Sequence, residues 1–270
     1  MISLFKYIRD ALIQFLHDLG AISIFLARVA RTWLTTEGNF KPVMEQVAYV
    51  SIRSLSTVAF AGMFVGAILV LQFNQILAQY DAQSFLGGLN TSSVVREVGP
   101  LIISFLLAGK IGAYTAAELG TMRVTEQIDA IECLGTNPIQ YLIVPRFIGI
   151  VISSVILLFI GLLISIGGAM LVANYLCGVN PLQFAVSVPR FTDGWTIGGG
   201  MFKSLVYGVI VGGVACHRGF TASGGARGVG KAVTMAAVYT NLYIVIANFI
   251  TSDIIDKVSE LGRMWLGGTS

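Results

Sequence analysis

A few charged and amide side chains inside or beside long apolar runs are the residues of this chain that can do chemistry. Arg96 and Glu97 are neighbours just before Gly99 and Pro100, at the start of one such run. Successive residues of a helix do not face each other, so we expect their partners on other helices or on a ligand. Charges in such positions are costly, which makes both residues candidates for a binding site.

Three more polar residues lie in or next to apolar runs. Lys110 is seven residues from Ala117, so its ammonium can reach the inner membrane interface, and a buried ion pair is the alternative. Gln72 and Gln75 lie at the outer end of the first apolar run. They either contact a polar head group or belong to the ordinary polarity of a membrane interface.

The segment 225–231 matches G-x-x-x-x-G-K, the beginning of a phosphate-binding loop. The next residue is Ala232, where Mg²⁺ binding requires Ser or Thr, and no strand is expected on either side. We therefore predict a tight turn without a nucleotide. With two histidines, no Ser/His/Asp set and no Cys/His spacing typical of metal ligands, we also expect no catalytic residue, metal or cofactor in this chain.

Composition places these residues in a membrane protein. Of the 270 residues, 55% are apolar and 11% are charged, and the mean hydropathy is +0.80. A soluble monomer could not cover its surface with so few polar groups. The same composition excludes a disordered chain, a disulfide-rich secreted scaffold and a nucleic-acid-binding protein.

Five stretches are long and apolar enough for a membrane-spanning helix, which needs about 20 residues. The sequence thus predicts an all-α membrane protein with a single domain over residues 1–270. The predicted spans are residues 54–73, 98–117, 147–177, 195–216 and 232–252.

The distribution of basic residues predicts the orientation. They gather before the first span and between the last two, at Arg218, Arg227 and Lys231, and short basic loops stay in the cytoplasm. The N-terminus is therefore predicted to be cytoplasmic and the C-terminus to lie on the outer side. Residues 1–37 are predicted to form an amphipathic helix in the cytoplasmic interface.

An amphipathic segment, residues 118–135, is predicted as a short cytoplasmic helix between the second and third spans. Val124, Ile128 and Ile131 form one apolar stripe, and Pro138 follows the end of the helix. Such a helix either rests on lipid or docks a soluble partner. The polar residues available for docking are Glu118, Arg123, Glu126, Gln127, Asp129 and Glu132.

Glycine spacing predicts close helix packing, within one chain or between two. The pairs Gly62/Gly66 and Gly208/Gly212 are both G-x-x-x-G arrays, which let helix backbones approach each other.

The run from Val95 to Pro145 closely resembles the MlaE/YrbE family of lipid ABC transporter permeases, and the likeness extends over most of the chain from about Phe40. Lys110 stands where the resemblance leads us to expect arginine; lysine keeps the charge and loses the guanidinium fork. The strongest matches are Arg96-Glu97 with Gly99-Pro100, Ala108-Gly109 with Gly112, Ala117-Glu118 with Gly120, and Met122-Arg123 followed by Thr125-Glu126-Gln127.

The resemblance implies the non-catalytic permease subunit of an ABC transporter. It would work as a homodimer in the bacterial inner membrane and move phospholipids between that membrane and the periplasmic side. Its partners would be cytoplasmic ATPase subunits, which bind ATP and Mg²⁺, periplasmic MCE-domain lipid-binding proteins and in some cases a STAS-domain protein.

The resemblance also bears on the site residues. Residues 118–135 match the family's coupling helix, which favours the docking interpretation. Arg96 becomes a candidate for the lipid phosphate, with Glu97 orienting it or contacting other helices. The alternative is a stand-alone secondary transporter or channel, which predicts acidic residues inside the spans or two related halves, and the sequence has neither.

Overall fold

The structure confirms an all-α membrane protein. A computed structural model describes residues 2–35 and 40–265, and over these ranges the chain forms helices joined by short turns, without a strand. Five of the described helices are long and apolar enough to span a membrane: Ile13–Thr35, Phe40–Ala78, Ile139–Cys177, Gly194–Phe220 and Gly225–Glu260.

The α-helices are, in chain order, α1 (Ile2–Thr35), α2 (Phe40–Ala78), α3 (Leu86–Ser93), α4 (Gly99–Leu107), α5 (Ala113–Val124), α6 (Gln127–Cys133), α7 (Val144–Cys177), α8 (Pro181–Phe191), α9 (Gly194–Phe220) and α10 (Gly225–Trp265). Between them lie the 3₁₀ turn η1 (Gln83–Phe85) and the π-helical turns η2 (Val94–Val98), η3 (Ala108–Gly112) and η4 (Ile139–Ile143).

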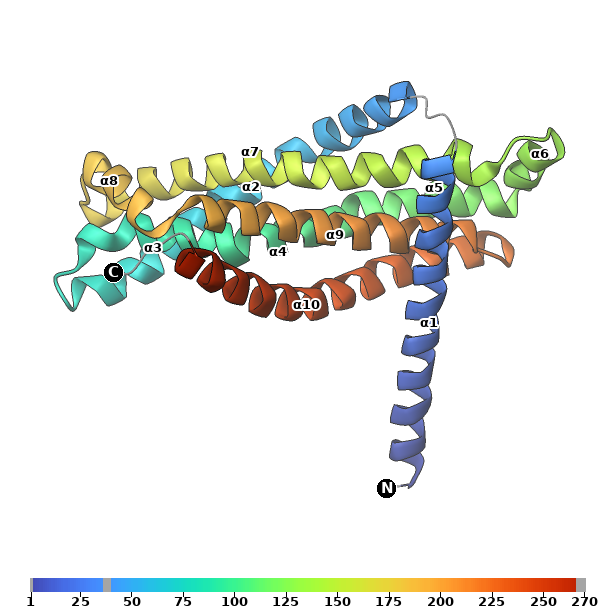
Figure 1. The fold of residues 1–270 in the computed structure, drawn as a ribbon, viewed down its shortest axis with the longest axis horizontal. Helices are drawn as coiled ribbons and strands as arrows, with labels where there is room; N and C mark the ends of the chain where they lie inside the picture. Colours follow the sequence, from blue (N-terminus) through green and yellow to red (C-terminus); the bar gives the residue numbers. More distant parts are fainter. Residues whose placement is uncertain (1, 36–39, 266–270) are drawn as a thin grey trace.

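The long helices α2, α7 and α9 run along the long axis of the molecule, α10 arches beside α9, and α1 crosses the bundle near one end (Figure 1). We call this the α6 end, because α6 lies there, and the opposite end the α8 end. Helices that span a membrane run along its normal, and α1 runs across the long helices of the bundle (Figure 1). By composition alone Ile13–Thr35 qualifies as a span, but its direction is that of the predicted interfacial helix.

Contacts with α9 hold α1 in this crossing orientation. Ile22, Phe25 and Val29 recur at helical spacing and are buried. Arg218 of α9 donates to Asp18 at 2.8 Å, and both side chains are less than one-fifth exposed. The two charged groups are thus paired where α1 passes over the bundle, and α1 is tied to it by both apolar and ionic contacts.

Glycines let α2 and α9 pack closely on α7. A Cβ added at Gly62 would lie 2.8 Å from the carbonyl oxygen of Gly161, and one at Gly66 would lie 2.2 Å from that of Ser165. On the other side, Cβ atoms at Gly208 and Gly212 would meet Ser154 and Phe147 of α7 at 2.3 and 3.0 Å. Both G-x-x-x-G arrays therefore lie at helix contacts within this chain.

The second predicted span, 98–117, differs from a regular helix. The chain follows one helical path through η2, α4, η3 and α5, but two π-helical turns interrupt the α-helical hydrogen bonding. These turns carry three of the charged residues of this path, Arg96 and Glu97 in η2 and Lys110 in η3. Such turns are rare and are frequent at functional sites.

The predicted single helix over 118–135 is wrong. Residues 118–124 extend α5, the chain reverses at Glu126, which has a left-handed φ of 60°, and α6 begins at Gln127. Because of this reversal, the side chain of Ile128 is fully buried and packs in a cluster with Phe25 of α1 and Ile143 of η4. Burial of this apolar side chain thus takes precedence over a continuous stripe through Val124.

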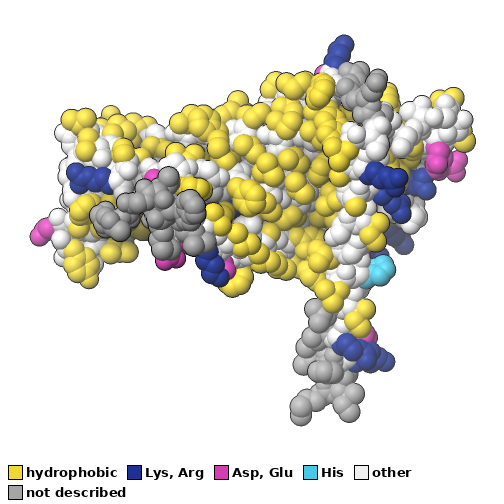
Figure 2. Space-filling view, viewed as in Figure 1, with side chains coloured by type: hydrophobic (Ala, Val, Ile, Leu, Met, Phe, Trp, Pro, Cys, Tyr) yellow, Lys and Arg dark blue, Asp and Glu magenta, His cyan; other side chains and the backbone are white. Residues whose placement is uncertain are grey.

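Figure 2 shows hydrophobic side chains over the middle of the bundle, with charged ones near its two ends and on α1. This distribution fits a protein whose middle faces lipid hydrocarbon and whose ends face head groups or water.

Candidate functional site

Five polar side chains from η2, α9 and α10 form a cluster at the α8 end, which we call the outer cluster. Its members are Arg96, Glu97, Lys203, Ser252 and Asp256. The ammonium of Lys203 donates to Glu97 Oε1 at 2.5 Å, to Ser252 Oγ at 2.8 Å and to the main-chain oxygen of Arg96 at 2.9 Å. The guanidinium of Arg96 pairs with Asp256 of α10.

Pro100 explains why main-chain groups take part in this cluster. Proline has no N–H, so the carbonyl groups four and five residues earlier, at Arg96 and Val95, lose a possible helical partner. Both face α9: a Cβ added at Gly200 would lie 2.5 Å from the Val95 oxygen, and the Arg96 oxygen accepts from Lys203. The close approach at Gly200 therefore brings Lys203, one turn later, to the freed carbonyl.

Lys203 is 2% exposed, and all three of its N–H donors have an acceptor. A buried ammonium is tolerated only when it is paired in this way. Arg96 and Asp256 are different, because their side chains are 45% and 57% exposed. The outer cluster thus has a fixed buried part and an accessible guanidinium above it.

A cavity of about 50 Å³ opens at the outer cluster. Arg96, Glu97, Lys203 and Asp256 line it, with Trp195 and Ile255 adding apolar surface. Its size suits a small polar group and not an acyl chain. Gln72 and Gln75 are exposed on α2 and are not among the residues that line this cavity.

Sequence reasoning predicted that Arg96 and Glu97 would have partners on other helices or on a ligand, and α9 and α10 provide them. It did not identify Lys203, Ser252 or Asp256 as those partners. A lysine inside a span was the signal that could have found the cluster, since such a charge needs a partner. Asp256 and Ser252 carry no comparable signal, because their proximity to η2 follows from the arching of α10.

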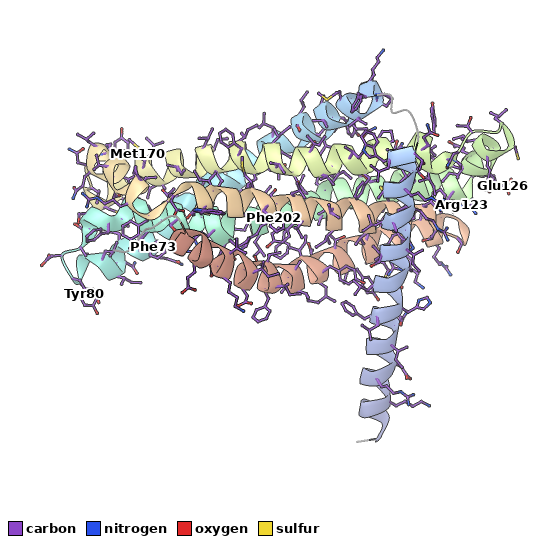
Figure 3. The ribbon with its side chains drawn as sticks, viewed as in Figure 1. Phe73, Tyr80, Arg123, Glu126, Met170 and Phe202 are labelled. Atoms are coloured by element: carbon purple, nitrogen blue, oxygen red, sulfur yellow. The ribbon has the colours of Figure 1, made fainter. Side chains whose placement is uncertain are left out.

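At the α6 end, an acidic surface projects beyond the bundle. Glu126, Gln127 and Glu132 are exposed, and Leu134 between α6 and η4 is 83% exposed. Figure 3 shows Arg123 and Glu126 at this end of the molecule. We call the three exposed polar residues and Leu134 the α6 surface.

Two ion pairs hold the α6 surface on the bundle. Arg123 at the end of α5 pairs with Asp129 of α6 across the reversed turn. Glu118 is bonded by Arg146 of α7, with N–O distances of 3.0 and 3.3 Å. Of the six predicted docking residues, Glu118, Arg123 and Asp129 therefore have partners within the chain, while Glu126, Gln127 and Glu132 remain accessible. Arg146 was not singled out from the sequence.

The segment 225–231 is not a phosphate-binding loop. Ser223, Gly224 and Gly225 make the turn between α9 and α10, with positive φ at both glycines, and the rest of the segment forms the first turns of α10. A phosphate loop wraps main-chain N–H groups around the anion, and here those N–H groups enter a helix. Among the described residues, no group of His, Cys, Asp and Glu could hold a metal ion.

Comparison with known proteins adds a family likeness. A family described as Permease MlaE matches residues 43–254. A probable ABC transporter permease protein of Synechocystis is 38% identical over 79% of this chain and 81% of its own length. A probable ABC transporter permease protein of Rickettsia felis is 32% identical over 91% of this chain and 95% of its own length. The Arabidopsis protein named TRIGALACTOSYLDIACYLGLYCEROL 1, chloroplastic, is 31% identical over 86% of this chain and 66% of its own.

Proposed function

The chain belongs to the MlaE family of ABC transporter permeases, and from that premise we propose that it moves phospholipids, with energy supplied by a separate ATPase subunit. One observation carries the lipid assignment: the outer cluster offers an accessible guanidinium at the α8 end of the bundle, beside a cavity that fits a phosphate-sized group. Arginine binds phosphate through two parallel hydrogen bonds. The Arabidopsis relative, which carries the name of a diacylglycerol glycolipid, supports a lipid cargo.

The α6 surface is proposed as the docking site of the ATPase. It is acidic and accessible at Glu126 and Glu132, and Leu134 adds an exposed apolar group, so it suits a partner with a basic, partly apolar groove. In this arrangement the α6 end is cytoplasmic and the α8 end is periplasmic. The basic residues Arg218 and Arg227 lie beside the turn between α9 and α10 and favour that orientation.

A continuous helical path connects the two proposed sites. From the α6 surface the chain can be followed back through α5, η3 and α4 to η2, which holds Arg96 and Glu97. Arg123 ties α6 to the end of α5. Movement of the ATPase against α6 would therefore shift this path and change the exposure of Arg96.

A second copy of the chain and lipid-carrying partners complete the proposal. Exposed aromatic residues on α2 and α10, such as Phe60, Phe64 and Phe249, provide apolar surface for lipid and for a homodimer contact. Periplasmic MCE-domain proteins would receive or deliver lipid at the α8 end, and a STAS-domain protein would join at the α6 end.

Reconstitution tests the function directly. The purified chain and its ATPase are placed in vesicles that contain a fluorescent phospholipid, and transfer of that lipid is followed with ATP and without it. We expect transfer only when both the ATPase and ATP are present. Transfer by the chain alone would contradict the proposal and favour a secondary transporter.

Reversing charge on the α6 surface is expected to break docking. The double variant Glu126→Lys and Glu132→Lys places two cations where two carboxylates met the partner, so ATPase recovered with a tagged chain should fall at least about tenfold. Glu260→Lys changes one exposed acid near the end of α10 and should leave recovery unchanged. Undiminished recovery with the double variant would rule out this docking surface.

Removing the guanidinium of Arg96 is expected to reduce lipid occupancy. In Arg96→Ala the phosphate loses its bidentate partner, and phospholipid counted by mass spectrometry in the purified assembly should fall about tenfold. Arg190 of α8 is exposed at the same end, so Arg190→Ala is the matched control and should retain normal occupancy. Normal occupancy in Arg96→Ala would remove Arg96 from the site.

A further inference from the structure

Two basic residues from different helices, Arg53 and Lys110, are in contact in the half of the bundle nearer the α6 end, through the ammonium of one and the main chain of the other. Lys110 of η3 donates to the main-chain oxygen of Arg53 in α2 at 2.6 Å and to Thr57 Oγ1 at 3.0 Å. The guanidinium carbon of Arg53 lies 4.4 Å from the ring centroid of Tyr49 and 5.9 Å from that of Tyr114. Both cations are exposed.

Neither cation has an anionic partner among the residues that the structure describes. Of the ion pairs formed by the residues that the structure describes, none includes Arg53 or Lys110. Glu118 lies one turn beyond Tyr114 on α5, but Arg146 bonds both of its oxygens. One carbonyl and one hydroxyl oxygen accept from two of the three N–H donors of Lys110 and leave its charge uncompensated.

The predicted depth of these two cations in the membrane indicates which anion would pair with them. Arg53 immediately precedes the apolar stretch 54–73, and Lys110 lies seven residues, or about 10 Å of helix, before Ala117. Arg53 therefore lies at the predicted edge of the hydrocarbon on the α6 side, and Lys110 lies deeper in its span with its ammonium at the Arg53 main chain. An uncompensated cation is costly at that depth, and lipid phosphate is the anion that is abundant there.

The local geometry leaves room for such a phosphate. Gly109, next to Lys110, is exposed, and a Cβ built on it would meet no atom within 4 Å. The two tyrosine rings orient the Arg53 guanidinium, whose planar fork matches a phosphate, while Lys110 adds a point charge.

We propose that Arg53 and Lys110 form a binding site for the phosphate of an anionic phospholipid in the leaflet at the α6 end. This site is distinct from the outer cluster. It deepens the proposed function and rests on it, because it gives the lipid cargo a phosphate contact on the side where the ATPase docks.

Native mass spectrometry of the delipidated assembly, titrated with phosphatidylglycerol, tests this site. In the double variant Arg53→Gln and Lys110→Gln, the Kd for this lipid is expected to rise at least about tenfold, since both charge-assisted contacts are lost. The matched control is Arg227→Gln with Lys231→Gln, which removes two exposed cations of α10 and should change the Kd less than about twofold. Lys110→Arg keeps the charge and should bind as the unaltered protein does.

Several outcomes would overturn the inference. A Kd within about twofold of the unaltered protein in the Arg53/Lys110 variant would remove the site. Displacement of the lipid by an equal concentration of inorganic phosphate would assign the cations to a free anion. Dissociation of two copies of the chain in that variant would assign them to a carboxylate of the second copy.

The test separates this inference from the proposed function. If the unaltered assembly transfers lipid while the double variant binds phosphatidylglycerol normally, only the Arg53/Lys110 site is wrong. If the double variant loses phosphatidylglycerol binding but the unaltered assembly transfers no lipid with ATP, the transport proposal is wrong and the binding site stands.

Discussion

Replacing Glu97 by alanine is expected to lower the free energy of unfolding by about 3 kcal/mol, because it leaves the ammonium of Lys203 buried without a counter-ion. Lys203 is 2% exposed, so water cannot take over the lost contact. The side chain of Glu97 is 44% exposed, which places the effect toward the lower end of the range for broken buried pairs. Titration with a denaturing detergent in mixed micelles measures the change.

A second variant separates the effect of the two charges on stability from the effect of the volume that the two side chains fill. Glu97→Gln combined with Lys203→Met removes both charges and keeps similar volumes, so it should recover most of the lost stability. Asp253→Ala breaks an exposed pair with Lys257 on α10 and should cost less than about 0.5 kcal/mol. If Glu97→Ala is no more destabilising than Asp253→Ala, burial of the Lys203 ammonium does not require Glu97 as its counter-ion.

Replacing Gly66 by valine is expected to cost about 3 kcal/mol or to prevent folding, because α2 and α7 cannot remain in contact. The added Cβ would lie 2.2 Å from the carbonyl oxygen of Ser165 and 2.9 Å from its carbonyl carbon. Both atoms belong to the main chain of α7, so no side-chain rotation can relieve the clash. The yield of folded protein and its thermal unfolding in detergent report the effect.

Gly167 provides a matched control for this glycine. It lies in α7 near the same contact, but a Cβ built on it meets no atom within 4 Å. Gly167→Val should therefore change stability by less than about 0.5 kcal/mol. Equal losses in the two variants would show that glycine flexibility, and not close approach of the helices, explains the effect at Gly66.

Hydropathy and charge were sufficient to predict the class of fold, and the resemblance of one motif was sufficient to predict the family. Long apolar stretches predicted spans inside α2, α7, α9 and α10, and the motif from Arg96 to Gln127 led to the family that the comparisons identify. These features are local, because each depends on apolar residues or on a short motif. The crossing direction of α1 is that of the interfacial helix predicted from the sequence.

Features that depend on contacts between distant segments were beyond the sequence. The left-handed turn at Glu126 follows from burial of Ile128 against α1, which no local pattern encodes. Asp256 lies 160 residues from Arg96, and only the arch of α10 brings them together. The roles assigned to the outer cluster and the α6 surface in lipid binding and docking remain predictions for the experiments above.

The crossing helix α1 has a mechanical consequence for the whole subunit. It is 34 residues long, or about 51 Å, and it is fastened to α9 through Asp18 and Arg218. A helix of this length in the membrane interface opposes tilting of the bundle. Any tilt would move its apolar side chains out of the lipid or its charged side chains into it. If the proposed ATPase docks on the α6 surface, we expect its force on α6 to slide helices past one another.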